Sequence, residues 1–66
     1  MTLREIREET KEMLTPQDIA DVLGSDPATI RETAKQRPDL IGFRFCFIGT
    51  RMKIPRAAFI RWMDGE

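Results

Sequence analysis

The sequence predicts a small α+β domain, mainly helical, in which two short helices, a β-hairpin and a last helix follow one another. Three observations predict it: two capped helical patterns in residues 15–36, apolar–polar alternation around Gly49, and renewed helical spacing in residues 56–63. With 66 residues, the chain forms one domain near the lower size limit for an independently stable core. We expect residues 14–66 to make up this domain and residues 1–13 to be an N-terminal amphipathic helix or arm.

Residues 2–13 are predicted to form the first, short amphipathic helix. Leu3, Ile6 and Met13 fall near one face, and charged side chains occupy the rest. A helix this short is marginal in water. It must therefore dock on the core, contact another chain or fray, and docking is the first expectation.

Thr15 to Gly24 carries the signals of a complete helix. Thr15 is a good N-cap, Pro16 suits the first helical position, and Asp18 completes a T-x-x-D capping box. Ile19 begins an apolar face at helical spacing. Gly24 ends the helix, because glycine adopts positive φ without strain.

A second helix follows after a tight turn. Asp26 can cap it, Pro27 takes its first position, and Ile30 and Ala34 form an apolar edge four residues apart. Together with Ala20 and Gly24, Ile30 gives a spacing that resembles the helix-turn-helix of DNA-binding proteins. The alternative is an αα-corner without any role in nucleic-acid binding.

The next segment changes to a period of two. Phe43, Phe45 and Phe47 alternate with polar or small residues, and Met52 and Ile54 do the same after a turn at Gly49. A two-stranded hairpin is not stable alone, so its aromatic face must cover the helices. We expect Phe45 to be a main core residue. The single cysteine, Cys46, falls on the opposite face, where it is expected to be a half-buried filler.

Pro55 ends the second strand and opens a last helix from Arg56 to Met63. Ala58, Phe59, Trp62 and Met63 give this helix an apolar stripe. The stripe explains Trp62 as a core anchor, and stacking of Trp62 on a base is the weaker alternative.

Charge is divided unevenly along the chain, although the net charge is zero. Residues 1–26 carry three basic and seven acidic side chains, a net charge of −4. Residues 27–66 carry eight basic and four acidic side chains, a net charge of +4. This division fits one surface that faces nucleic acid and an acidic back, with few phosphates neutralised.

Several classes of function are disfavoured by composition. The chain has no histidine and one cysteine, so we expect no internal disulfide, no metal site, no cofactor and no catalytic residue. No apolar run approaches the ~20 residues that span a membrane, and no signal-peptide core is present. We expect a cytoplasmic protein that is not an enzyme.

From Leu14 to Trp62, the chain resembles the small winged helix-turn-helix domain of excisionases and MerR-type proteins. The residues that carry the resemblance are LTPQDIADVLG, the helix that starts Pro27-Ala28-Thr29-Ile30-Arg31, and IGTRMKIPRAAFIRWM. The resemblance implies double-stranded DNA as partner, with the second helix in the major groove and the hairpin as a wing along the backbone or minor groove.

Site residues follow from these positions. In the recognition helix we expect DNA contacts from Ala28, Thr29, Arg31, Glu32 and Lys35; in the wing from Thr50, Arg51 and Lys53; and at the N-terminus of the preceding helix from Thr15 and Gln17. Arg31 could fork onto a guanine, Glu32 could accept from a cytosine or hold Arg31, and Lys35 suits a phosphate. The alternative is a solvated helix face with intrahelical pairs.

The family further implies an accessory factor of a bacterial mobile element, such as a phage or conjugative transposon. Such a recombination directionality factor bends DNA and biases an integrase toward excision, without catalysis of its own. MerR-type regulators usually continue into a long dimerising helix, whereas this sequence stops at Glu66. Two alternatives stay open: a small transcription regulator with the same DNA contacts, and a winged-helix module that binds protein.

The sequence also departs from the family pattern. Ala28, Arg31 and Thr50 stand where other residue types are common in the family. Low affinity per protomer, with cooperative self-association on repeated sites and an integrase or recombinase as further partner, is the expectation. The protein would then associate with the nucleoid.

Overall fold

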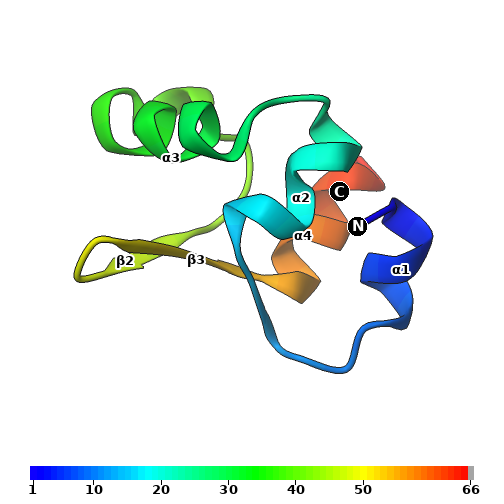
Figure 1. Cartoon of the computed structure of the whole chain (residues 1–66). Coiled ribbons are helices and arrows are strands. Elements are labelled where there is room, and N and C mark those ends of the chain that lie inside the picture. The colour runs from blue at the N-terminus through cyan, green and yellow to red at the C-terminus, as the bar shows by residue number, and fades with distance from the viewer. Residues whose placement is uncertain (66) are drawn as a thin grey trace.

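A computed structural model describes residues 1–65 of the chain, and these fold into four α-helices and a three-stranded antiparallel sheet (Figure 1). In chain order the elements are α1 (Leu3–Glu8), β1 (Met13–Leu14), α2 (Pro16–Leu23), α3 (Pro27–Gln36), the 3-10 turn η1 (Pro38–Leu40), β2 (Cys46–Ile48), β3 (Arg51–Pro55) and α4 (Arg56–Met63). The predicted class, a mainly helical α+β domain, is confirmed.

The capping signals of α2 and α3 act as the sequence predicts. The Thr15 hydroxyl accepts a hydrogen bond from the Asp18 N–H, and the Asp18 carboxylate accepts one from the Thr15 N–H at 2.9 Å. Gly24 ends α2 in the left-handed region with φ of 68°. Asp26 caps α3 by accepting from the Ala28 N–H. Local chemistry therefore fixes the bounds of both helices.

The sheet has one strand more than predicted, and β3 lies at its centre. Met13 and Leu14 of β1 pair with one edge of β3, and Cys46–Ile48 of β2 pairs with the other edge. Strand β2 also begins later than the phenylalanine alternation indicates. Phe43 leaves the strand pattern because its ring packs edge-on against Phe59, 5.1 Å between centroids.

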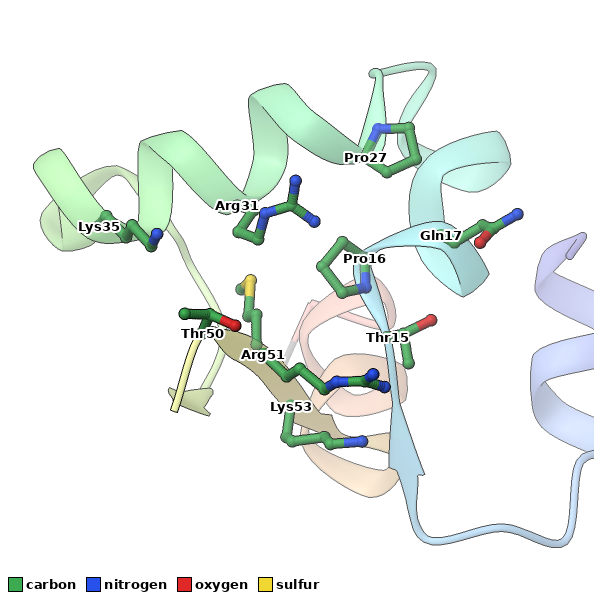
Figure 2. Close-up of a pocket in the computed structure, with 10 residues that line it drawn as sticks. Thr15, Pro16, Gln17, Pro27, Arg31, Lys35, Thr50, Arg51 and Lys53 are labelled. Atoms are coloured by element: carbon green, nitrogen blue, oxygen red, sulfur yellow. The ribbon is translucent and has the colours of Figure 1, made fainter. Parts of the chain in front are cut away.

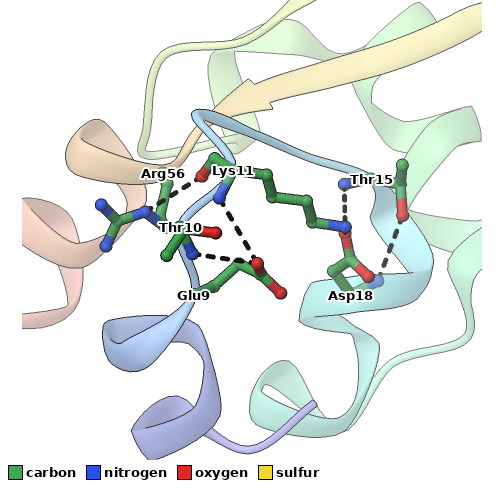
Figure 3. Close-up of polar contacts among 6 residues, drawn as sticks. All are labelled: Glu9, Thr10, Lys11, Thr15, Asp18 and Arg56. Carbon is green, nitrogen blue, oxygen red and sulfur yellow. Dashed lines mark hydrogen bonds and ion pairs between the residues drawn. The ribbon is translucent and has the colours of Figure 1, made fainter.

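The prediction of a helix over residues 2–13 is wrong in its second half. Helix α1 ends at Glu8, and the chain then runs extended into β1 (Figure 3). Arg56 holds this segment in place: its side chain donates to the Lys11 carbonyl at 3.1 Å, and its N–H donates to the Glu12 carbonyl at 2.8 Å. A tertiary contact thus replaces the last turns of the predicted helix.

The core gathers residues from every helix and from β1 and β3. Its buried members are Ile6, Leu14, Ile19, Ile30, Ala34, Phe43, Met52, Ile54 and Phe59. Phe45 and Phe47 are only partly buried and pack against this core. The N-terminal segment is therefore part of the packed body, because Ile6 and Leu14 are fully buried.

Two residues lie elsewhere than predicted. Trp62 is 38% exposed at the edge of the core, because Phe59, one turn earlier in α4, fills the centre. Its ring still contacts those of Phe43 and Phe59, with centroids 5.2 and 6.0 Å away. Cys46 is exposed rather than half-buried, since it lies opposite Lys53 on the outer face of the hairpin.

None of the helices in residues 1–65 has the length and apolar character needed to cross a membrane.

Candidate nucleic-acid interface

A groove of about 460 Å³ opens between α3, the β2–β3 hairpin and the N-terminus of α2 (Figure 2). Its walls come from three separate elements that the fold brings together. The lining residues are Thr15, Pro16, Gln17, Pro27, Arg31, Lys35, Thr50, Arg51, Met52 and Lys53.

Helix α3 forms one wall of the groove. Ile30 and Ala34 are buried and fix the inner face of the helix. At about 100° per residue, Arg31 and Lys35 fall on one flank of α3, and Glu32 lies opposite the buried face. Both side chains line the groove, and Figure 2 shows them on the side of α3 that faces the hairpin, with the Arg31 guanidinium directed along the helix toward Pro27. Arg31 therefore lies on the side of α3 next to the hairpin and not on the outermost ridge of the helix, where Glu32 lies.

The hairpin forms the opposite wall. Gly49 makes its turn possible, with φ of 64°, and Thr50 follows at the tip. The side chains of Arg51 and Lys53 extend from β3 toward Thr15 (Figure 2). Lys35 bridges the two walls, because its ammonium nitrogen lies 6.0 Å from the centroid of the Phe47 ring.

The N-terminus of α2 closes one end of the groove. Gln17 is exposed there, whereas the Thr15 hydroxyl is engaged in the helix cap. The first N–H groups of a helix carry partial positive charge. The only carboxylate in this first turn, Asp18, is paired with the Lys11 ammonium at 2.8 Å (Figure 3).

The titration of Asp18 reflects this environment. Burial pulls its pKa upward, but hydrogen bonds from the Lys11 ammonium and the Thr15 N–H outweigh burial. The net result is a pKa below the ordinary value of an aspartate. Asp18 thus stays ionised and neutralised by Lys11 near the end of the groove.

Four cationic side chains line the groove, namely Arg31, Lys35, Arg51 and Lys53. Among the residues that the structure describes, no acidic side chain lines it. All four come from positions that the sequence predicts as DNA contacts. Guanidinium and ammonium groups along one groove provide hydrogen-bond donors and positive charge for a chain of phosphates.

Seven of the ten predicted site residues line this one groove, namely Thr15, Gln17, Arg31, Lys35, Thr50, Arg51 and Lys53. The other three do not. Ala28 is exposed on the outer surface of α3. Thr29 and Glu32 line a separate hollow beside η1, where Glu32 accepts a hydrogen bond from the Gln36 amide at 2.7 Å.

Sequence reasoning missed the apolar part of the groove. Pro16, Pro27 and Met52 line it, and all three were assigned only to helix starts or to the core. Both prolines occupy first helical positions, where the missing N–H costs nothing. Because both prolines stand at the starts of adjacent helices, the sequence could have indicated that they lie close together beside the groove.

Comparison of the chain with protein-family models, curated proteins and solved structures gave no match. The chemistry of the groove therefore provides the functional interpretation. A cationic, open groove with a prominent helix on one side suits an extended polyanion better than a small ligand.

Proposed function

We propose that this protein is a sequence-specific, non-catalytic DNA-binding factor, with α3 as its recognition helix and the β2–β3 hairpin as its wing. The observation that supports this most directly is the groove between these two elements. Arg31 and Lys35 meet Arg51 and Lys53 there without an acidic neighbour among the lining residues. A winged helix-turn-helix places positive charge in this arrangement.

In the proposed complex, α3 enters the major groove, whose width of about 12 Å admits a helix. The phosphate strand that borders the major groove lies in the cationic groove of the protein. Arg31, expected from the sequence to read a guanine, is then a phosphate contact, together with Lys35, Arg51 and Lys53. The outer surface of α3, with Ala28, Thr29 and Glu32, faces the base edges.

The finer part of the proposal is an excisionase-like role in the recombination of a mobile element. Four cations neutralise few phosphates, so one protomer binds weakly. Cooperative binding of several protomers at adjacent repeats would supply the missing affinity. Partner contacts with an integrase would then determine the direction of recombination.

The first test is binding of purified protein to a random duplex over a series of salt concentrations, with Arg51→Ala as the variant. Each lost phosphate contact reduces the slope of log K against log salt by about 0.9. We expect weaker binding to every sequence and a shallower slope by roughly this amount.

Arg4→Ala is the matched control, because it removes the same charge from α1, on the opposite side of the molecule from the hairpin (Figure 1). The Arg4 side chain is 89% exposed, and within residues 1–65 its ion pair is with Glu8 in the same helix. The salt slope of Arg4→Ala should change much less than that of Arg51→Ala, because Arg4 makes no phosphate contact in the proposed complex. Equal effects of the two variants would show that the groove is not the binding surface.

Selection from a random-sequence pool then separates the candidate roles. Enrichment of direct repeats supports the excisionase-like factor, and a single palindrome points to a dimeric transcription regulator. Absence of binding at low salt would exclude DNA and leave a protein-interaction module.

A further inference from the structure

We propose that Ile48, at the tip of the hairpin, is an apolar wedge that enters the minor groove of DNA and unstacks a base step. This inference rests on the proposed DNA-binding function and adds to it a second contact site, separate from the cationic groove. Its chemistry is insertion of a side chain between bases, not a phosphate contact.

The position of Ile48 is the first observation. It is the last residue of β2, pairs with Arg51 across the hairpin, and directly precedes the turn at Gly49. Ile48 is 66% exposed, more than any other large hydrophobic side chain in residues 1–65. Phe45 and Phe47, by contrast, pack against the core. Ile48 therefore contributes little to the packing of the core.

Charge around Ile48 indicates the kind of partner. From Ile41 to Met63 the sequence contains no aspartate or glutamate, whereas Arg44, Arg51 and Lys53 lie in or beside the hairpin. An apolar tip on a cationic hairpin fits a partner with an anionic surface and an apolar interior. Double-stranded DNA has this combination, with phosphates outside and stacked bases within.

Geometry places the tip at the minor groove. One phosphate strand separates the major groove of DNA from the adjacent minor groove. If that strand lies between α3 and β3, the hairpin on the far wall lies over the minor groove. The minor groove is about 6 Å wide and admits only a narrow element. Gly49 carries no side chain, which keeps the turn slim.

An isoleucine suits the role of a wedge. Branching at Cβ makes its side chain stiff, so little rotamer freedom is lost on insertion. Apolar side chains inserted between base steps from the minor groove kink DNA by about 20–90°. Pyrimidine–purine steps unstack most easily. The wedge would therefore add a preference for such a step at a position where the protein makes no hydrogen bond to a base.

The test uses duplexes of the selected binding site with 2-aminopurine at successive positions, together with end-labelled duplexes for energy transfer. Unstacking raises 2-aminopurine fluorescence, and a kink brings the two ends closer. We expect the wild-type protein to raise the fluorescence at one step beside the wing and to increase energy transfer. Ile48→Ala should lose both signals and keep the salt slope of the wild type.

Met13→Ala is the matched control, because Met13 is a large apolar side chain, 36% exposed in β1, and lines neither the cationic groove nor the hollow beside η1. It should give the signals of the wild type. Thermal melting of both variants checks that the fold is retained, since neither side chain is buried.

Four outcomes would overturn the proposal that Ile48 is a wedge. Specific binding by the wild type without a fluorescence rise at any step excludes insertion, although DNA binding stands. Unchanged bending by Ile48→Ala shows that another residue kinks the duplex. Ile48-dependent binding to vesicles of phosphatidylserine and phosphatidylcholine, without unstacking of DNA, assigns the tip to a lipid surface. If the wild type binds no duplex at all, the proposed function fails as well.

Discussion

Residue 42 must be a glycine because the Trp62 ring lies close to its backbone. A Cβ atom at residue 42 would overlap the indole nitrogen of Trp62. The Trp62 ring also packs against Phe43 and Phe59, so a shift away from residue 42 would disturb these contacts. The half-exposed tryptophan therefore requires a glycine in the loop before β2.

Gly42→Ala should accordingly destabilise the protein by about 1–3 kcal/mol, the usual cost of an overpacked site. The measurement is urea unfolding followed by circular dichroism, which also reports unfolding in the absence of Trp62, the single tryptophan of the chain. The control is a double-mutant cycle with Trp62→Ala, in which the alanine at residue 42 has space. An equal cost of Gly42→Ala in both backgrounds would locate the strain elsewhere.

The phenylalanines differ in burial, contrary to the expectation that Phe45 is a main core residue. Phe59 is fully buried, and Phe45 is only partly buried. Phe59→Ala should cost about 3–5 kcal/mol and unfold much of the protein, because total stability in domains of this size is small. Phe45→Ala should cost clearly less in the same thermal melts. A larger loss for Phe45→Ala would contradict the observed packing.

At the scale of elements, the segment between α1 and β1 connects the two ends of the fold. Lys11 pairs with Asp18 of α2, and Arg56 of α4 donates to the carbonyl of Lys11 (Figure 3). Arg56 also donates to the carbonyl of Arg7. An ion pair between Arg7 and Asp64 adds a contact from α1 to the end of α4. These contacts hold β1 against β3 and position the N-terminus of α2 beside the groove.

The Lys11–Asp18 pair predicts a pH dependence of stability. The pKa of Asp18 is lowered in the folded state, so the carboxylate binds its proton more tightly after unfolding. Its contribution is fully present above the ordinary aspartate pKa of about 3.9 and is lost as pH falls through the lower, folded value. Asp18→Asn should lower stability at neutral pH and little at pH 2.

Urea unfolding at a series of pH values measures this effect. Asp21→Asn is the matched control, because the Asp21 side chain is 79% exposed and, in the part of the chain that the structure describes, pairs with the N-terminal amine alone. Its difference from the wild type should be small throughout. A difference for Asp18→Asn that stays constant down to pH 2 would show that the capping geometry, and not the charge, is responsible.

At the scale of the whole molecule, the hairpin is more basic than the N-terminal part of the fold. Helix α1 and the loop after it carry Glu5, Glu8, Glu9 and Glu12 together with three basic side chains, a net charge of −1. The hairpin on the other side of the molecule carries Arg51 and Lys53 and no acidic side chain (Figure 1). Such a distribution gives the hairpin side the more positive potential, which is the side that a polyanion would approach.

Removal of negative charge from α1 and the loop after it should strengthen DNA binding without changing its sequence preference. The double variant Glu8→Gln, Glu12→Gln is expected to bind every duplex more tightly at low salt, with the gain vanishing near 1 M salt, where the Debye length is about 3 Å. Fluorescence anisotropy with two unrelated duplexes measures both affinity and preference. A gain that persists at high salt would mean a direct contact of α1 with DNA.

Sequence alone predicted the elements whose signals are local. The capping box at Thr15, the stop at Gly24 and the cap at Asp26 depend on hydrogen bonds within three or four residues, and the structure shows each of them. The cationic positions of the candidate site were also identified, because residue type and element were both readable. Their gathering into one groove is visible only in the tertiary structure.

Only the tertiary structure decided the features that depend on contacts between distant residues. Strand β1 exists because β3 offers an edge and Arg56 holds the preceding loop, so no pattern in residues 9–14 indicates it. Phe59 displaced Trp62 from the centre of the core through packing in three dimensions. Arg31 lines the groove because buried Ile30 and Ala34 set the rotation of α3, a property of the assembled core and not of the helix itself.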